Sequence, residues 1–256
     1  MAITLYPTLA QTLSCPKRYT LEKVQRKEIL APFMTSELGR QVHNRIAHSL
    51  RSNKPANESE LCLPRRLLLS QGESPDTLMT RAYACLEHFN NYYRPWLAEF
   101  EVVAVEHKIV SRLSWFDEAI TISGVIDAVV KTPDGVLLLD WKTGSMAGVD
   151  EQLRWYFALY CMDQPETQLE ARAINLFSSE TYVVKDFATP QSWLANKVRA
   201  LLSSFKLAQE NKHKAVAGRQ CQYCPYAEGC GSSTAKARVM LDTFTGEIIQ
   251  GKTSYV

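Results

Sequence analysis

Two aspartates and a lysine stand where apolar strands normally hold no charge. Asp127 lies inside one apolar run, and Asp140 and Lys142 end the next, after a turn at residues 132–135. Buried charges are unfavourable unless they are paired or bound to a metal ion. Alternate residues of a strand point to the same face, so we expect Asp140 and Lys142 on one face and Trp141 on the other.

These residue types favour a divalent-metal site that hydrolyses phosphodiesters. Adjacent strands lie about 4.7–4.9 Å apart, so carboxylates on neighbouring strands can share one cation. Oxygen ligands suit Mg²⁺ or Mn²⁺, and the backbone carbonyl of Trp141 could add another. Lys142 would place its ammonium near the attacking water or the pentavalent phosphate. The alternative is an exposed strand end with a surface pair of Asp140 and Lys142.

Periodicity along the chain predicts the elements that position these residues. Loose alternation of apolar residues predicts strands, and apolar residues at helical spacing predict helices. The Pro-Asp-Gly turn supports an antiparallel hairpin. The predicted strands are 100–110, 119–131, 135–141, 171–177 and 181–187, and the predicted helices are 36–52, 77–97, 149–162 and 190–210. This order predicts an α/β fold, with a central mixed β-sheet flanked by helices.

Two further segments complete the prediction. Residues 53–64 contain prolines and short polar side chains and are predicted to form a loop. Residues 237–250 contain a Thr-Gly turn and could form a small hairpin or a loose tail.

Composition and charge are those of an ordinary globular protein. The chain has 256 residues, of which 46% are hydrophobic and 22% charged, and its formal net charge is +2. No apolar run could span a bilayer and the start shows no signal-peptide pattern, so we expect a cytoplasmic protein with no membrane partner. Basic residues gather at positions 17–27 and 197–219. They could contact phosphates or form solvated helix faces.

Two pairs of residues carry a resemblance to a known family. Gly124 precedes Asp127 by three positions, and Asp140 and Lys142 follow after the turn. This pattern resembles the core of the PD-(D/E)XK nuclease superfamily, which has a restriction-endonuclease-like fold. The resemblance implies that both aspartates bind Mg²⁺ or Mn²⁺ and that Lys142 is catalytic.

Two flanking motifs are similar to those of the RecB-like branch of that superfamily. Gly39 and His43 are four residues apart on a predicted helix, and so are Gln152 and Tyr156 after the Asp-x-Lys strand. The resemblance implies that His43 is the third metal ligand. Gln152 and Tyr156 share a helix face and could grip a phosphate or position the lysine. The alternatives are an ordinary histidine, a surface glutamine and a buried tyrosine.

Glu106 is a further candidate near the metal. It lies on the strand before Gly124, and its neighbour His107 should point to the opposite face of that strand.

Three cysteines gather in one short segment. Cys221, Cys224 and Cys230 have spacings typical of a metal site, but three thiolates do not close a tetrahedral site. A fourth ligand must come from elsewhere. Cys15 is a candidate, because it lies between Ser14 and Pro16, where the local sequence pattern is interrupted. The remaining cysteines, Cys62, Cys85 and Cys161, are predicted to be packed thiols.

The placement of these cysteines at both ends resembles that of RecB-like nucleases with iron–sulfur clusters. It is similar to the CRISPR-associated RecB-like exonucleases and to the nuclease domain of the AddB helicase subunit. The resemblance implies a [4Fe–4S] cluster at Cys15, Cys221, Cys224 and Cys230, which would join the N- and C-terminal segments. The alternatives are a structural Zn²⁺ with the same ligands and four unliganded thiols.

Together the motifs predict a metal-dependent DNA nuclease, an exonuclease on single-stranded or frayed ends. The chain has no Walker-type phosphate loop and therefore brings no motor of its own. CRISPR adaptation, recombination and repair all fit, with proteins of those pathways as partners besides DNA. A non-catalytic DNA-binding or assembly subunit with the same fold is the alternative from another class.

We expect one nuclease domain over residues 1–256. Its predicted parts are an N-terminal cysteine segment and helical region at 1–100, a catalytic core at 101–187, a C-terminal helix and cysteine cluster at 188–230, and a tail at 231–256.

Overall fold

The computed structural model describes residues 3–25, 31–57, 61–70, 72–113, 120–165, 168–212, 214–218, 221, 224–227, 230–234 and 238–249. The chain divides into two compact units, which are described separately. The first contains Met1–Pro7, Gly39–Glu60 and Arg81–Val198, and the second contains Thr8–Leu38, Leu61–Thr80 and Arg199–Val256. The division into parts at residues 100, 187 and 230 stays a prediction.

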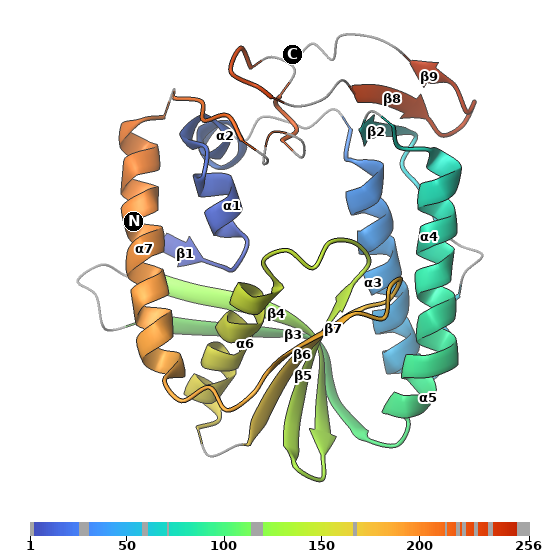
Figure 1. Ribbon diagram of the computed structural model, residues 1–256, viewed down its shortest axis with the longest axis vertical. Coiled ribbons are helices and arrows are strands. Elements are labelled where there is room, and N and C mark those ends of the chain that lie inside the picture. The colour runs from blue at the N-terminus through green and yellow to red at the C-terminus, as the bar shows by residue number, and fades with distance from the viewer. Residues whose placement is uncertain are drawn as a thin grey trace. The chain divides into compact units, whose positions relative to one another are not determined.

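A six-stranded mixed sheet forms the centre of the first unit (Figure 1). Its strands are β1 (Ile3–Leu5), β3 (Glu101–Leu113), β4 (Ile120–Thr132), β5 (Gly135–Lys142), β6 (Leu169–Asn175) and β7 (Thr181–Val184). The order is β1-β4-β5-β6-β7, and β3 pairs with β4 along its whole length. The pairs β1–β4 and β5–β6 are parallel, and the others are antiparallel. The predicted mixed sheet is therefore confirmed.

The predicted hairpin between residues 119 and 141 is confirmed as β4 and β5. Ala128 pairs with Leu139 and Thr132 with Gly135, so the turn lies between Thr132 and Gly135. Two predicted strands end early. β6 ends at Asn175, whose side-chain oxygen accepts the backbone N–H groups of Phe177 and Ser178 at 3.0 and 3.1 Å and so closes a turn.

Four of the observed helical regions match predicted ones. They are α3 (Met34–Ser52), the run of α4 (Pro75–His88), η2 (Phe89–Tyr93) and α5 (Arg94–Leu97), α6 (Val149–Asp163) and α7 (Pro190–Glu210). The π-helical turn η2 ends two residues before Pro95, which has no N–H to continue an α-helical ladder. Among the described residues, none of the helices combines the length and apolarity that crossing a membrane requires.

The sheet of the first unit is buried on both faces near β5. Trp141 is 1% exposed, and its ring centroid lies 5.6 Å from that of Phe89 and 5.7 Å from that of Tyr93. Helix α6 packs against β4, β6 and β7 (Figure 1). Its Trp155 is also 1% exposed and donates its indole N–H to the Ser123 carbonyl at 3.0 Å. This packing fixes the middle of β4, which carries Asp127, and the end of β5, which carries Asp140 and Lys142.

The second unit contains short helices and a small antiparallel sheet. The helices are α1 (Leu9–Leu13), α2 (Pro16–Tyr19) and η1 (Thr20–Val24), and the sheet has the order β2-β8-β9, with β2 (Arg66–Ser70), β8 (Arg238–Asp242) and β9 (Ile248–Ile249). For the segment 237–250, the hairpin alternative is thus confirmed over the loose tail at residues 238–249, while residues 237 and 250 lie outside the described part of the chain. Strand β2 follows the predicted loop and was not predicted.

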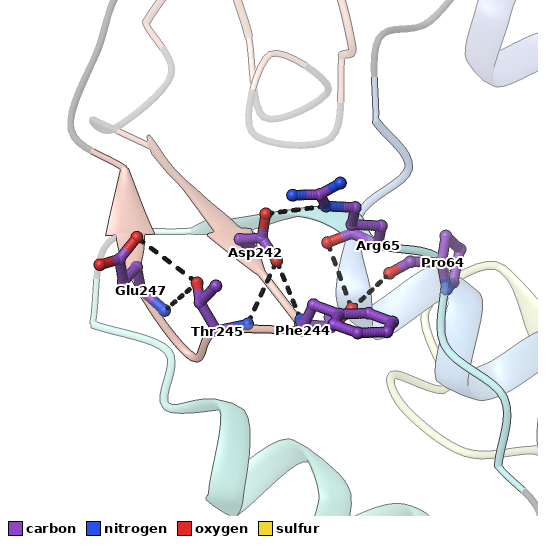
Figure 2. A network of polar contacts seen from close by, with 7 residues as sticks. Pro64, Arg65, Asp242, Phe244, Thr245 and Glu247 are labelled. Atoms are coloured by element: carbon purple, nitrogen blue, oxygen red, sulfur yellow. Dashed lines mark hydrogen bonds and ion pairs between the residues drawn. The ribbon is translucent and has the colours of Figure 1, made fainter.

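Asp242 holds the turn of this small sheet together (Figure 2). Its Oδ1 accepts the backbone N–H groups of Phe244 and Thr245 at 2.9 and 3.3 Å. Its Oδ2 accepts a hydrogen bond from Arg65 Nε at 3.1 Å. Thr243 Oγ1 donates to the Pro64 carbonyl at 2.9 Å. These contacts join the segment before β2 to the β8–β9 turn.

Candidate active site

Three side chains from three elements bring metal-ligand atoms together in the first unit. His43 on α3, Glu106 on β3 and Asp127 on β4 each offer one such atom, and these atoms lie within 4.8 Å of one another. His43 Nδ1 lies 3.3 Å from Asp127 Oδ2, which also accepts the backbone N–H of Trp141 at 2.7 Å. We call these three residues the His–Glu–Asp group.

Glu106 has an unusual backbone conformation for a strand residue. Its φ is +53°, in the left-handed region that residues other than glycine rarely adopt. Such a conformation costs on the order of 1–3 kcal/mol and persists only where the surroundings impose it. The flanking pairs Val105–Ala128 and His107–Ile126 place Glu106 opposite Asp127. The strain therefore coincides with the position where the two carboxylates meet.

Asp140, Lys142, Gln152 and Tyr156 form a second set of contacts, which we call the Lys142 network. Lys142 Nζ lies 2.6 Å from Asp140 Oδ2 and donates to Gln152 Oε1 at 2.8 Å. Gln152 Nε2 donates to Asp140 Oδ1 at 3.1 Å and to the Tyr156 hydroxyl at 2.7 Å. The Gln152 amide thus orients an acid, an ammonium and a phenol at once.

Burial and charge perturb the ionisation of both sets. Asp140 is 3% exposed, and burial together with the charge of Asp127 raises its pKa against the opposing effect of Lys142. Burial and Asp127 also raise the pKa of Glu106. Burial alone would lower the pKa of His43, but its attraction to Asp127 outweighs burial and the pKa is raised. Perturbed groups gathered in this way are typical of functional sites.

Tyr156 stays a neutral phenol in this environment. Burial raises its pKa first, and the charge of Asp140 adds to the effect. Its hydroxyl accepts the hydrogen bond from Gln152, so its own proton is available for a further acceptor.

Comparison with known proteins agrees with this geometry. A family model described as the PD-(D/E)XK nuclease superfamily matches residues 7–231. The chain belongs to that superfamily. No curated protein matches the chain at a significant level.

Two solved structures have some similarity to this superfamily member. One, from Eubacterium rectale, is named "Putative exonuclease"; it has a TM-score of 0.50 and 10% identity, over 82% of this chain and 83% of its own. The other is the crystal structure of SSO0001, with a TM-score of 0.45 and 13% identity, over 89% of this chain and 85% of its own. At these identities the Eubacterium rectale structure supports the fold alone.

Two glycines of the superfamily-like motifs allow close approaches at the site. A Cβ on Gly124 would lie 2.9 Å from the ring of Tyr156, and a Cβ on Gly39 would lie 3.1 Å from Thr143 Oγ1. The first glycine lets α6 bring its phenol against β4. The second lets α3, which carries His43, approach the residue that follows Lys142.

The structure thus gathers the predicted residues into two sets of contacts. Within the part of the chain that the structure describes, Asp140 is not a member of the His–Glu–Asp group but pairs with Lys142. The backbone N–H of Trp141 bonds to Asp127, whereas the role of its carbonyl as a ligand stays a prediction. Arg51 was not foreseen: it donates from Nη2 to the Val105 carbonyl at 3.2 Å. Its only sequence signal is its place eight residues after His43, on the same broad helix face.

The four cysteines expected to share a ligand line one small cavity in the second unit. They are Cys15, Cys221, Cys224 and Cys230, and Lys17 and Arg18 line the same cavity. Burial opposes ionisation of Cys221, but hydrogen bonds from Thr234 and from the Gly218 backbone outweigh it and lower the pKa of the thiol. A lowered thiol pKa favours the thiolate form that binds metals.

The other three cysteines differ from one another. Cys85 is fully buried, and burial raises the pKa of its thiol to about 11. Cys161 is half-buried, and Cys62 is exposed in the segment before β2. The prediction of a packed thiol is therefore wrong for Cys62, because residues 61–64 form no helix or strand that could bury it.

Proposed function

We propose that this chain is a metal-dependent DNA nuclease that acts as an exonuclease on single-stranded or frayed ends. The observation that carries the proposal is the ammonium of Lys142 held between Asp140 and Gln152, on the strand next to Asp127. Membership of the PD-(D/E)XK nuclease superfamily supports hydrolysis of a phosphodiester. A non-catalytic subunit would have no need of a lysine fixed in this way.

The residues at the site fit a divalent cation. The proposed ligands are His43, Asp127 and Asp140, with the Trp141 carbonyl, and Glu106 is added because it lies in the His–Glu–Asp group. Asp140 Oδ2 is buried, and Lys142 Nζ lies 2.6 Å from it, so a cation bound there would lie next to the ammonium. Carboxylate oxygens with one imidazole suit Mg²⁺ or Mn²⁺. When bound, the metal would polarise a phosphoryl oxygen and lower the pKa of a bound water.

The remaining residues of the Lys142 network have distinct proposed roles. Lys142 would orient the attacking water and stabilise the negative charge that develops on the phosphate. Gln152 would position Lys142 and Asp140 through the bonds at 2.8 and 3.1 Å. The neutral hydroxyl of Tyr156 would donate a hydrogen bond to a phosphate oxygen.

Substitution of Lys142 tests the proposal. Lys142→Ala should lower the rate of hydrolysis of a labelled oligonucleotide by about 10²–10³-fold in Mn²⁺ or Mg²⁺. Lys131→Ala, an exposed lysine on β4, serves as the matched control and should keep the wild-type rate. Cleavage by Lys142→Ala at the wild-type rate would rule out the assignment. DNA binding without any metal-dependent cleavage by the wild-type chain would instead favour the non-catalytic subunit.

We also propose a [4Fe–4S] cluster held by Cys15, Cys221, Cys224 and Cys230. Support comes from their common cavity and from the resemblance of their spacing to iron–sulfur nucleases. The cluster would join segments more than 200 residues apart in the chain and so stabilise the fold. Anaerobically purified protein should be brown and contain iron. A colourless protein that contains zinc would favour the alternative, a structural Zn²⁺ on the same cysteines.

For the biological setting we propose three pathways and do not choose one. A cytoplasmic nuclease of this size fits CRISPR adaptation, recombination or repair, with DNA and proteins of those pathways as partners. Purification of the tagged chain from its own cells, followed by identification of bound proteins, tests which of these pathways it serves.

A further inference from the structure

The part of the β3–β4 ribbon between the candidate active site and its far end, residues 108–113 and 120–125, has one buried and one exposed face. The buried face consists of apolar residues that are at most 7% exposed: Ile109, Leu113, Ile120 and Ile122. The alternate positions are exposed or half-buried, and we call them the outer ribbon face: Lys108, Val110, Arg112, Thr121, Ser123 and Val125. Strict alternation of this kind fixes which side chains reach solvent.

The outer ribbon face is basic and polar, with exposed methyl groups between the charges. Across the ribbon, Lys108 pairs with Val125, Val110 with Ser123 and Arg112 with Thr121. Val110 is 52% exposed and Val125 is 41% exposed.

Neither basic side chain of this face is paired with an acid among the described residues, which in this ribbon end at Leu113 and resume at Ile120. Within the described residues Lys108 and Arg112 form no ion pair, and no acid belongs to the outer ribbon face itself. The two are four residues apart on β3, which corresponds to about 14 Å along the strand. They therefore offer two separate positive charges to an anionic partner.

This face is continuous with the candidate active site. Lys108 follows Glu106 by two residues on β3, and Val125 precedes Asp127 by two residues on β4. Two residues of a strand span about 7 Å, so the outer ribbon face begins close to the His–Glu–Asp group. A polymer that reaches this group can lie along the ribbon without leaving the two strands.

We propose that the outer ribbon face carries the DNA strand on its approach to the His–Glu–Asp group. This proposal rests on the proposed nuclease function. Lys108 and Arg112 contact backbone phosphates, while the Ser123 and Thr121 hydroxyls donate hydrogen bonds. The exposed methyl groups of Val110 and Val125 contact sugars and bases. Contacts of this kind position a strand and read no sequence.

A pair of charge-removing substitutions tests the proposal. Binding of a labelled single-stranded oligonucleotide is measured at several salt concentrations, in a Lys142→Ala background so that the probe is not cut. The double variant Lys108→Gln/Arg112→Gln should lose two phosphate contacts. The slope of log affinity against log salt concentration, which we call the salt slope, should therefore be shallower by about 1.4. Between 50 and 200 mM salt, the affinity of this variant should therefore fall about sevenfold less than that of its parent.

The matched control removes two exposed lysines elsewhere in the same unit. Lys131→Gln/Lys185→Gln changes the net charge equally but leaves the outer ribbon face intact, and it should keep the parental slope. If both double variants have the same slope, the outer ribbon face does not carry DNA.

Cleavage by the chain with Lys142 intact, measured in parallel, separates the two proposals. Metal-dependent cleavage together with an unchanged slope overturns only the ribbon proposal. Absence of both cleavage and DNA binding overturns the nuclease function and the ribbon proposal together.

Discussion

The side-chain amide of Gln152 accepts a hydrogen bond from Lys142 at 2.8 Å and donates one to Asp140 at 3.1 Å. One uncharged group thereby holds both members of an ion pair whose own atoms are 2.6 Å apart. Because Gln152 comes from α6 and the ion pair from β5, this amide connects the helix to the strand end that the proposed chemistry uses.

Replacement of Gln152 should slow cleavage without unfolding the chain. Gln152→Leu removes all three hydrogen bonds of the amide, to Lys142, Asp140 and Tyr156, but keeps a similar volume, so Lys142 and Asp140 lose their fixed orientation. Loss of an orienting partner of this kind typically costs about 10–100-fold in activity or metal affinity. The measurement is kcat on a labelled oligonucleotide, with circular dichroism as the check on folding. An unchanged kcat would show that Lys142 and Asp140 orient each other.

Glu106 allows a test in which stability and metal binding respond separately. At φ +53° glycine is favoured over alanine by about 1–2 kcal/mol, so Glu106→Gly should be more stable to denaturant than Glu106→Ala. Both variants lack the carboxylate and should bind Mn²⁺ more weakly than the wild type in calorimetry. Equal stability of the two variants would contradict the left-handed backbone. Wild-type Mn²⁺ affinity in both would remove Glu106 from the ligand set.

Local patterns in the sequence predicted much of the first unit. The expected helix 190–210 has the bounds of α7, and the expected Asp-x-Lys strand 135–141 corresponds to β5. Both have strong local signals, namely a long apolar period in one case and a Pro-Asp-Gly turn in the other. The four-residue spacing of Gln152 and Tyr156 likewise placed them on one helix face, and the 2.7 Å bond between them agrees.

Contacts between distant segments were beyond the reach of such patterns. Strand β2 contains three consecutive leucines, Leu67, Leu68 and Leu69, which show neither the alternation of a strand nor the spacing of a helix. The strand pairs with β8, which lies more than 160 residues later in the chain. The strain at Glu106 depends on its position opposite Asp127, which no local pattern states. Residues 61–64, which expose Cys62, have no periodic signal at all.

Gly124 should tolerate no side chain, because the ring of Tyr156 occupies the space. The Cβ of Gly124→Ala would lie 2.9 Å from that ring, and overpacking of this kind typically destabilises the folded state by about 1–3 kcal/mol. Displacement of the phenol should also lower the rate of cleavage. Gly144→Ala is the matched control, since nothing lies within 4 Å of its added Cβ. Denaturant unfolding of both variants checks the difference, and equal stabilities would contradict the close approach of α6 to β4.

Asp242 should make the stability of the small sheet depend on pH. Hydrogen bonds from the Phe244 backbone, followed by that of Arg65, lower its pKa below the ordinary value of 3.8 (Figure 2). A carboxyl whose pKa is lower in the folded state stabilises that state fully above its unfolded pKa, and the effect disappears as pH falls through the folded pKa. Asp242→Asn should therefore destabilise β2 and β8 at pH 7, and the difference from wild type should vanish in strong acid.

Two measurements check this prediction. Hydrogen exchange of the β2 and β8 amides is measured at neutral pH, and unfolding is measured between pH 7 and pH 2. Asp134→Asn, in the exposed turn between β4 and β5, removes a charge without these partners and should leave the exchange of β2 and β8 unchanged. A constant difference between Asp242→Asn and wild type across the whole pH range would mean that Asp242 acts through its shape and not its charge. The turn at residues 242–246 would then be held by its backbone geometry, in which Gly246 has a φ of +74°.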